Sequence, residues 1–303
     1  MLNIILLLVG FVMLIKGADI FVESSSSIAK KFKIPSIIIG MTIVAMGTSA
    51  PELSVSINSA MNGMADLSIA NVVGSNIFNV LVALGVCSMI HKLKISNYQD
   101  VVTLLSVSTI LVILSMDISL GMLNGLLLLG VFTIYIINMI KKAKANKVEE
   151  EIENKKPLWL TIILGLLGLV GIVWGGDLVV DSASAIAMAF GMSENLVGLT
   201  IVAVGTSLPE FVTSLMATKK GEVDIAVGNI IGSNIFNILL ILGVSSILNP
   251  LTVSFITYLD MLFMLVTTLI FAVATFKNKE VTKTLGIPMV IAYVIYIIIT
   301  IIR

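Results

Sequence analysis

The sequence is poor in charged residues. They make up 12% of its 303 residues, whereas soluble proteins contain about 25%, and the mean hydropathy is +1.12. So few charges cannot cover a water-facing surface, and we therefore expect an integral membrane protein. The 18 basic and 18 acidic residues balance, which excludes an overall electrostatic attraction to nucleic acid.

Cysteine and histidine are nearly absent, and this excludes several kinds of site. Cys87 is the one cysteine, so neither a disulfide framework nor a CxxC site can form within the chain. His91 is the one histidine, which excludes a cluster of histidine ligands and a histidine-based catalytic triad. Neither a GxGD nor an HExxH motif occurs. We predict a protein that is not an enzyme and has no cofactor, and the sequence indicates no protein partner.

Hydrophobic runs long enough to cross a bilayer occur ten times. A bilayer core needs about 20 apolar residues per helix. The runs cover residues 2–29, 36–62, 67–90, 101–116, 120–140, 158–188, 195–217, 224–248, 253–276 and 285–302. The sequence therefore predicts an all-α polytopic membrane protein with ten transmembrane helices.

Basic residues are distributed very unevenly among the predicted loops. Of the 18, sixteen lie in the loops after the first, third, fifth, seventh and ninth spans, and the other two are Lys16 and Arg303. Because cytoplasmic loops collect Lys and Arg, we predict that the odd-numbered loops are cytoplasmic and that both termini are extracellular. The small size of the chain favours the plasma membrane of a prokaryote.

The chain repeats itself at an offset of 158 residues. Residues 40–56 (GMTIVAMGTSAPELSVS) and 198–214 (GLTIVAVGTSLPEFVTS) are identical at 11 of 17 positions. Residues 71–88 (NVVGSNIFNVLVALGVCS) and 229–246 (NIIGSNIFNILLILGVSS) are identical at 12 of 18 positions. Neither comparison needs a gap, so we interpret the chain as an internal duplication.

Each copy contains five predicted spans, and an odd number places the second copy upside down in the membrane. We predict a first repeat over 1–140, a cytoplasmic linker over 141–157 and a second, inverted repeat over 158–303. Inverted repeats are typical of secondary transporters, whose substrate site lies near the midplane between the copies.

The second and seventh spans each contain the motif GTSxPE near their middle. Pro51 and Pro209 cannot donate a backbone hydrogen bond and are expected to break these helices. Broken backbone is tolerated in a membrane only where it faces protein or a polar cavity. The motif also supplies hydroxyls and a carboxylate from residues Thr48, Ser49 and Glu52 in the first copy and Thr206, Ser207 and Glu210 in the second.

A glutamate at the bilayer centre costs about 2.5–3.5 kcal/mol on insertion scales. Glu52 and Glu210 occur at equivalent places, which favours a shared cation site. The alternative is that each is a protonated side chain that joins two helices by a hydrogen bond.

The third and eighth spans repeat the motif GSNIFN. Its polar residues recur every four positions and so line one face of a helix, at Asn71, Ser75 and Asn79 and at Asn229, Ser233 and Asn237. One such stripe is typical of contacts between membrane helices. Two equivalent stripes, beside two intramembrane glutamates, favour a common polar cavity.

All of these candidate ligands are oxygen donors, the set that hard cations prefer. They fit Ca²⁺, which takes six to eight oxygens in flexible geometry, and Na⁺, and they do not favour copper or zinc. Two carboxylates balance one Ca²⁺. Without the ion they would repel one another, so one of them would take up a proton or another cation. This favours exchange over uniport.

Paired GTSxPE and GSNxxN segments in two inverted halves of five spans resemble the cation/calcium antiporter superfamily, and in particular the compact prokaryotic sodium/calcium exchangers. The resemblance covers nearly the whole chain. It implies a secondary antiporter that exchanges Na⁺ for Ca²⁺ electrogenically, with the first and sixth spans sliding across a core made of the others.

The resemblance also implies roles for individual residues. Glu52 and Glu210 would bind both ions. Further ligands would be the carbonyls of Thr48, Thr206, Ala45 and Ala203, the hydroxyls of Ser49, Ser207, Ser75 and Ser233, and the amides of Asn79 and Asn237 at the centre. Some relatives carry an acid at the position of Asn237. Its absence here argues against potassium coupling.

Two points stay open at the level of sequence. The motif GTSxPE favours sodium, but two glutamates can also carry two protons, so a proton-coupled exchanger of Ca²⁺ or another divalent cation is the alternative, and a channel is a further one. Five further intramembrane acids have no assigned role: Asp19, Glu23, Asp177, Asp181 and Asp260. The first four lie toward helix ends, where solvation at the interface or a place at an ion entrance are both compatible with the sequence.

Overall fold

The computed structural model describes residues 2–95, 97–146, 156–192, 201 and 203–302. Most of them are helical, as predicted. The first half contains α1 (Leu2–Phe32), α2 (Ser36–Ile39), η1 (Gly40–Val44), α3 (Ala45–Thr48), α4 (Ala50–Met61), α5 (Ala65–Phe78), η2 (Asn79–Ala83), α6 (Leu84–Ile90), α7 (Tyr98–Leu114), η3 (Ser115–Asp117) and α8 (Met122–Ala145). The second half contains α9 (Leu158–Ala189), α11 (Ala203–Gly205), α12 (Leu208–Lys219), α13 (Val223–Phe236), η5 (Asn237–Ile241), α14 (Leu242–Leu248), α15 (Phe255–Asn278) and α16 (Lys283–Ile302).

Eight helices in the described part of the chain are long and apolar enough to cross a membrane. A ninth span is the bent run from α2 to α4, whose two parts meet at 48°. This bend confirms the predicted break in the second span. The predicted seventh span begins at 195, and residues 195–200 and 202 lie outside the described residues, as do 147–155 of the predicted linker. Only α11 and α12 represent the seventh span.

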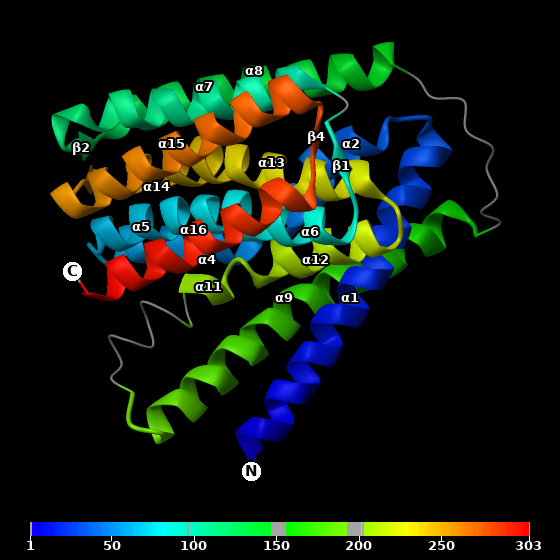
Figure 1. Ribbon diagram of the computed structural model, residues 1–303, viewed down its shortest axis with the longest axis horizontal. Helices are drawn as coiled ribbons and strands as arrows, with labels where there is room; N and C mark the ends of the chain where they lie inside the picture. The colour runs from blue at the N-terminus through cyan, green and yellow to red at the C-terminus, as the bar shows by residue number, and fades with distance from the viewer. Residues whose placement is uncertain (1, 96, 147–155, 193–200, 202, 303) are drawn as a thin grey trace.

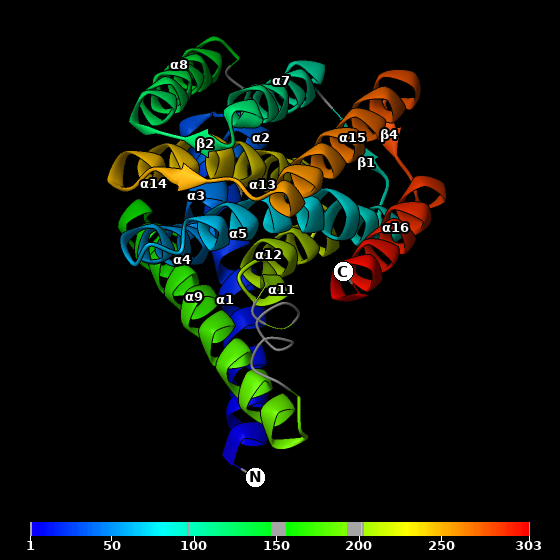
Figure 2. The ribbon, with the colours of Figure 1, turned by 90° about the vertical axis from the view of Figure 1, so that its left-hand side faces the viewer.

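Helices α1 and α9 form a pair that projects from the other helices (Figures 1 and 2). Glycines bring the two backbones together. A Cβ atom on Gly17 would lie 2.7 Å from the Gly168 oxygen, and one on Gly10 would lie 3.0 Å from the Gly175 oxygen. Gly10 and Gly168 are equivalent in the repeat, as are Gly17 and Gly175. The contact is therefore reciprocal between the two copies.

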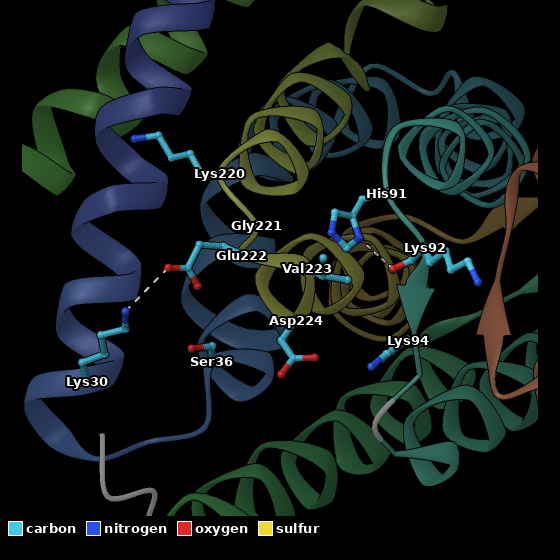
Figure 3. Close-up of a pocket in the computed structure, with 10 residues that line it drawn as sticks. All are labelled: Lys30, Ser36, His91, Lys92, Lys94, Lys220, Gly221, Glu222, Val223 and Asp224. Carbon is cyan, nitrogen blue, oxygen red and sulfur yellow. Dashed lines mark hydrogen bonds and ion pairs between the residues drawn. The ribbon is translucent and has the colours of Figure 1, made fainter. Parts of the chain in front are cut away.

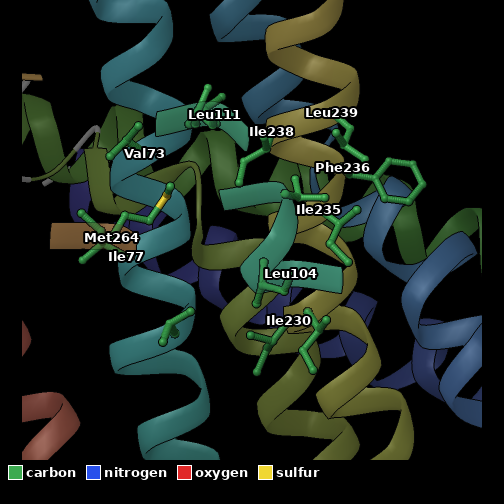
Figure 4. Close-up of a cluster of buried hydrophobic side chains, with 14 of the residues drawn as sticks. Val73, Ile77, Leu104, Leu111, Ile230, Ile235, Phe236, Ile238, Leu239 and Met264 are labelled. Carbon is green, nitrogen blue, oxygen red and sulfur yellow. The ribbon is translucent and has the colours of Figure 1, made fainter. Parts of the chain in front are cut away.

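The third and eighth predicted spans form the centre of the molecule. Within their apolar windows, 72% of the α5–α6 run and 83% of the α13–α14 run is buried, against 11% for α16. Their outer faces pack against α7 and α15 through a cluster that includes Ile77, Leu104, Phe236 and Met264 (Figure 4). The polar stripes of the sequence are therefore carried by the two most enclosed spans.

Four strands of two residues join the copies. β1 (Leu93–Lys94) pairs with β4 (Glu280–Val281), and β2 (Ser119–Leu120) pairs with β3 (Leu251–Thr252), both antiparallel. Strands this short leave no alternating pattern in a sequence, and they were not predicted. Each pair joins one strand of the first half to one of the second.

Candidate cation-binding site

The GTSxPE motifs produce the helix breaks at the centre of the structure. Ser49, with φ −82° and ψ 8°, separates α3 from α4, and Ser207, with φ −86° and ψ 0°, precedes α12. Pro51 and Pro209 lie in the first turn of the helices that follow, where a missing backbone N–H is tolerated. Proline therefore starts a new helix here rather than kinking a continuous one.

Glu52 and Glu210 lie in the first turns of α4 and α12. Both side chains are fully buried. The N-terminal end of a helix carries partial positive charge, which favours a carboxylate at this place. The two breaks thus place two acids at equivalent helix starts in the protein interior.

Each glutamate accepts a hydrogen bond from a serine. Ser75 Oγ donates to Glu52 Oε1 over 3.1 Å, and Ser49 Oγ donates to Glu210 Oε1 over 2.9 Å. The spacing in the sequence places Ser49 on the face of Glu52 if the helix resumes at once. The structure differs, because the break at Ser49 turns its hydroxyl toward the glutamate of the other copy.

Several buried oxygens around the two acids have no hydrogen-bond partner within the described residues. They are Oε2 of Glu52 and Glu210, Oδ1 of Asn79 and Asn237, and Oγ of Ser207. A buried polar group without a partner costs about 1–3 kcal/mol. Five such oxygens together fit a dehydrated cation, which would bind to them as ligands. They include two carboxylates, two amides and a hydroxyl, the hard-donor set predicted from the sequence.

Four asparagine amides form a reciprocal network between α5–η2 and α13–η5. Asn76 Nδ2 donates to the Asn234 carbonyl over 3.2 Å, and Asn234 Nδ2 donates to the Asn76 carbonyl over 3.3 Å. Asn79 Nδ2 donates to Asn234 Oδ1 over 3.0 Å, and Asn237 Nδ2 donates to Asn76 Oδ1 over 3.1 Å. These hydrogen bonds fix the Nδ2 atoms of Asn79 and Asn237, and they leave the Oδ1 atoms of both residues available to a ligand.

Sequence analysis did not select Asn76 and Asn234. The signal was present, because this asparagine of GSNIFN is identical in both copies. It immediately follows the serine of each polar stripe in the sequence and therefore lies on a different side of the helix. Helical periodicity alone did not indicate it.

Asn71 and Asn229 fix the backbone that carries the acids. Asn71 Nδ2 donates to the Glu52 carbonyl over 3.3 Å, and Asn229 Nδ2 donates to the Glu210 carbonyl over 3.2 Å. Each also donates over 2.9 Å to a serine hydroxyl of the helix that carries the glutamate, Ser56 in α4 and Ser214 in α12. Equivalent residues thus make equivalent bonds in the two copies.

The threonines of GTSxPE bond to these asparagines across the repeat. Thr48 Oγ1 donates to Asn229 Oδ1 over 3.0 Å, and Thr206 Oγ1 donates to Asn71 Oδ1 over 3.3 Å. Each copy therefore orients the ligands of the other.

The remaining predicted ligands are distributed unequally. Ser233 Oγ lies 3.4 Å from Thr48 Oγ1 and 3.5 Å from the Ala45 carbonyl, which also accepts Ser49 N over 3.0 Å. Ala203 begins α11. No group of three or more His, Cys, Asp and Glu side chains that could hold a metal occurs in the described part. The cluster therefore contains two acids and neutral oxygens.

Comparisons with known proteins identify the family of the chain. Residues 2–141 and 160–302 match the family model described as sodium/calcium exchanger protein. The putative antiporter CaxA of Alkalimonas amylolytica is 41% identical over 257 residues, 81% of each chain. The sodium/calcium exchanger MaX1 of Methanosarcina acetivorans is 30% identical over 98% of each chain.

A solved structure has the same fold. The sodium-calcium exchanger NCX_Mj, soaked with 2.5 mM Na⁺ and 0.1 mM Ca²⁺, superimposes with a TM-score of 0.88 at 29% identity, over 98% of each chain. With its duplicated motifs, its buried pair of glutamates and these matches, the chain belongs to the sodium/calcium exchanger protein family and is a membrane transporter rather than an enzyme.

Proposed function

We propose that this protein is a secondary antiporter that moves Na⁺ in one direction and Ca²⁺ in the other, and that both ions bind between Glu52 and Glu210. The observation that carries the proposal is the group of unpartnered oxygens around these two acids. Two carboxylates balance the charge of one Ca²⁺, while the amide and hydroxyl oxygens replace its lost water.

The empty site is unfavourable, and this is the physical reason for coupling. Two carboxylates in a dry interior repel one another strongly. Release of Ca²⁺ therefore requires that other cations take its place, and sodium ions satisfy the same oxygens. Binding one species excludes the other, so opening the site first to one side of the membrane and then to the other exchanges them.

We further propose that the fold consists of ten membrane spans in two inverted repeats, 1–140 and 158–303, joined by a cytoplasmic linker. The strand pairs support the inversion. β1 follows the third span and pairs with β4, which follows the ninth. In a repeat without inversion, β1 would share a side of the membrane with β3, its own equivalent at the offset of 158.

The lysine distribution supports a cytoplasmic side at the odd-numbered loops and extracellular termini. YrbG of Escherichia coli, 33% identical over 90% of this chain, is named an inner membrane protein, which supports the plasma membrane of a prokaryote. In this orientation α1 and α9 would slide across the core to open the site to one side at a time.

Proton coupling is the alternative, because two glutamates can also carry two protons. A flux measurement separates the two. The full chain is reconstituted in liposomes and uptake of ⁴⁵Ca²⁺ is followed with an outward Na⁺ gradient at equal pH, and then with an outward H⁺ gradient without Na⁺. We expect uptake in the first case only. Uptake driven by protons alone would replace sodium exchange with proton exchange as the function.

If more positive charge leaves with Na⁺ than enters with Ca²⁺, an inside-positive membrane potential should increase Ca²⁺ uptake. This measurement tests whether the exchange is electrogenic. A channel would conduct without a counter-ion gradient, so efflux of ²²Na⁺ in proportion to Ca²⁺ uptake excludes it. Liposomes that contain the Glu52→Gln variant measure the background uptake of ⁴⁵Ca²⁺.

A further inference from the structure

The end of the molecule that carries the odd-numbered loops has charged contacts between α1 and the core. The turn between α12 and α13 contributes Lys220 and Glu222. Lys220 Nζ lies 2.8 Å from Asp19 Oδ1 and 3.7 Å from Glu23 Oε2, and it donates to the Asp19 carbonyl over 3.1 Å. One core lysine therefore binds two acids of α1.

Glu222 makes the complementary contacts with the same helix. It accepts a hydrogen bond from Ser26 Oγ over 2.5 Å and lies 3.9 Å from Lys30 Nζ. Figure 3 shows Lys220 and Glu222 both directed toward α1, with the ion pair from Lys30 to Glu222 drawn. We name Lys220, Glu222 and their four partners on α1 the α1 latch.

The other copy has the same backbone but lacks the charges that would bind α9. The equivalent turn contains Asn62 and Met64 in place of Lys220 and Glu222. Both turns use a glycine with positive φ, 75° at Gly63 and 79° at Gly221. The two turns therefore share this glycine conformation and differ in the residues on either side of it.

Helix α9 keeps the acids and the serine of α1. Asp177, Asp181 and Ser184 are equivalent to Asp19, Glu23 and Ser26. Ser184 Oγ is buried without a hydrogen-bond partner among the residues that the structure describes, whereas Ser26 Oγ binds Glu222. Across the same described residues, Asp177 and Asp181 form no ion pair. Helix α9 therefore keeps three of the four α1 partners, with Met188 at the position of Lys30, while the complementary charges occur in only one of the two turns.

We propose that the α1 latch holds the odd-numbered-loop side of the transporter closed and that its absence from the opposite side makes the two access states unequal in energy. The proposal rests on the proposed function, because it requires that α1 moves against the core during exchange. Opening the odd-numbered-loop side separates Lys220 from Asp19 and Glu222 from Ser26. Opening the other side breaks no such contacts.

Solution reaches the latch directly. A cavity of about 620 Å³, lined by Lys30, Lys220 and Glu222 among others, opens beside it. Partly exposed ion pairs are individually weak, and salt screens them. Together, six groups in one network are expected to change the ratio of the two states by about tenfold, and by less at high ionic strength.

Distances between spin labels test this. Labels at positions 31, on α1, and 94, on the core, are attached to cysteines in a full-length Cys87→Ser chain, and their distance distribution is measured in liposomes. The double variant Lys220→Asn/Glu222→Met copies the residues of the other turn. We expect it to increase the population open on the odd-numbered-loop side about tenfold. Lys219→Asn removes the neighbouring exposed lysine and should leave the distribution unchanged.

A second variant keeps the test independent of whether the first one folds. Asn62→Lys/Met64→Glu places the same two charges on the turn that is equivalent in the repeat, and we expect the opposite shift. An unchanged distribution in both double variants, or an equal shift in Lys219→Asn, would overturn the latch. Sodium-driven uptake by the unmodified chain is measured in the same liposomes. Its absence would overturn the proposed function, and the distances would still decide whether the latch exists.

Discussion

Ser49 of the first copy donates a hydrogen bond to Glu210 of the second over 2.9 Å. Thr48, Asn76 and Asn79 likewise bond to residues 155–181 positions away. The site is therefore a property of the two copies together, and neither contains a complete set of ligands. The predictions below separate the ligands from the groups that orient them.

Removing one carboxylate should abolish Ca²⁺ transport. Glu52→Gln and Glu210→Gln each leave a single negative charge for a desolvated divalent ion, and we expect uptake of ⁴⁵Ca²⁺ to fall by about 100-fold or more, equivalent to 2.7 kcal/mol or more. Glu280→Gln is the matched control, since Glu280 lies at the surface in a 3.5 Å ion pair with Lys92. Uptake near the unmodified rate in either site variant would place the ion elsewhere.

An added acid at the centre should make transport depend more strongly on pH. In Asn237→Asp, a carboxyl oxygen replaces Nδ2, which donates to Asn76 Oδ1 and Ser75 Oγ. The new group must release a proton to bind a cation and hold one otherwise. The half-saturating Ca²⁺ concentration should therefore rise as pH falls, by up to about tenfold per pH unit. The same profile in the unmodified chain and the variant would show that Asn237 does not contact the ion.

The asparagine network should affect affinity without contributing a ligand. Asn234→Ala removes the acceptor of Asn79 Nδ2 and the donor to the Asn76 carbonyl. Loss of these bonds, at about 1–3 kcal/mol, should raise the half-saturating Ca²⁺ concentration roughly tenfold.

The exposed Asn138 of α8 gives the control variant Asn138→Ala. Isothermal titration of the purified chains with Ca²⁺ measures both effects. Equal affinity in the two variants would contradict a positioning role for Asn234, and a melting profile identifies any loss of folding.

Close contact between α1 and α9 should be intolerant of a single methyl group. In Gly17→Ala the new Cβ would lie 2.7 Å from the Gly168 oxygen and 2.8 Å from Ile172 N, both of them backbone atoms. We expect a loss of about 1–3 kcal/mol in stability, read as a lower unfolding midpoint in detergent. Gly130→Ala in α8 meets no atom within 4 Å and should not lower the midpoint. Equal unfolding midpoints in the Gly17→Ala and Gly130→Ala variants would contradict the close packing of α1 against α9.

The sequence was sufficient to predict two buried acids at the helix breaks as candidate ligands, but not to find the hydrogen-bond partners of the residues around them. In each span a proline two positions after the break and a glutamate three positions after it mark the place, because a missing N–H and a charged group in an apolar span both have large local costs. The assignment of Ser49 to Glu210 depends on the turn at the break and on how two distant helices face each other. Periodicity within one helix contains no such information, and the same limit applies to Asn76 and the two-residue strands.

The different contacts of the turns at residues 62–64 and 220–222 could not be predicted from the sequence either. In the sequence Lys220 is simply one basic residue of a loop, and its charge was interpreted only as a marker of the cytoplasmic side. The ion pair with Asp19 adds a second role, because the lysine whose charge predicts the orientation of the chain also binds α1.

The strand pairs at the ends of the bundle have a consequence for biogenesis. β1 and β2 leave the ribosome long before their partners β3 and β4, which lie more than 130 residues further along. Until then their backbone groups have no partner strand. The amino-terminal copy therefore completes these backbone hydrogen bonds only after the second copy has been synthesised.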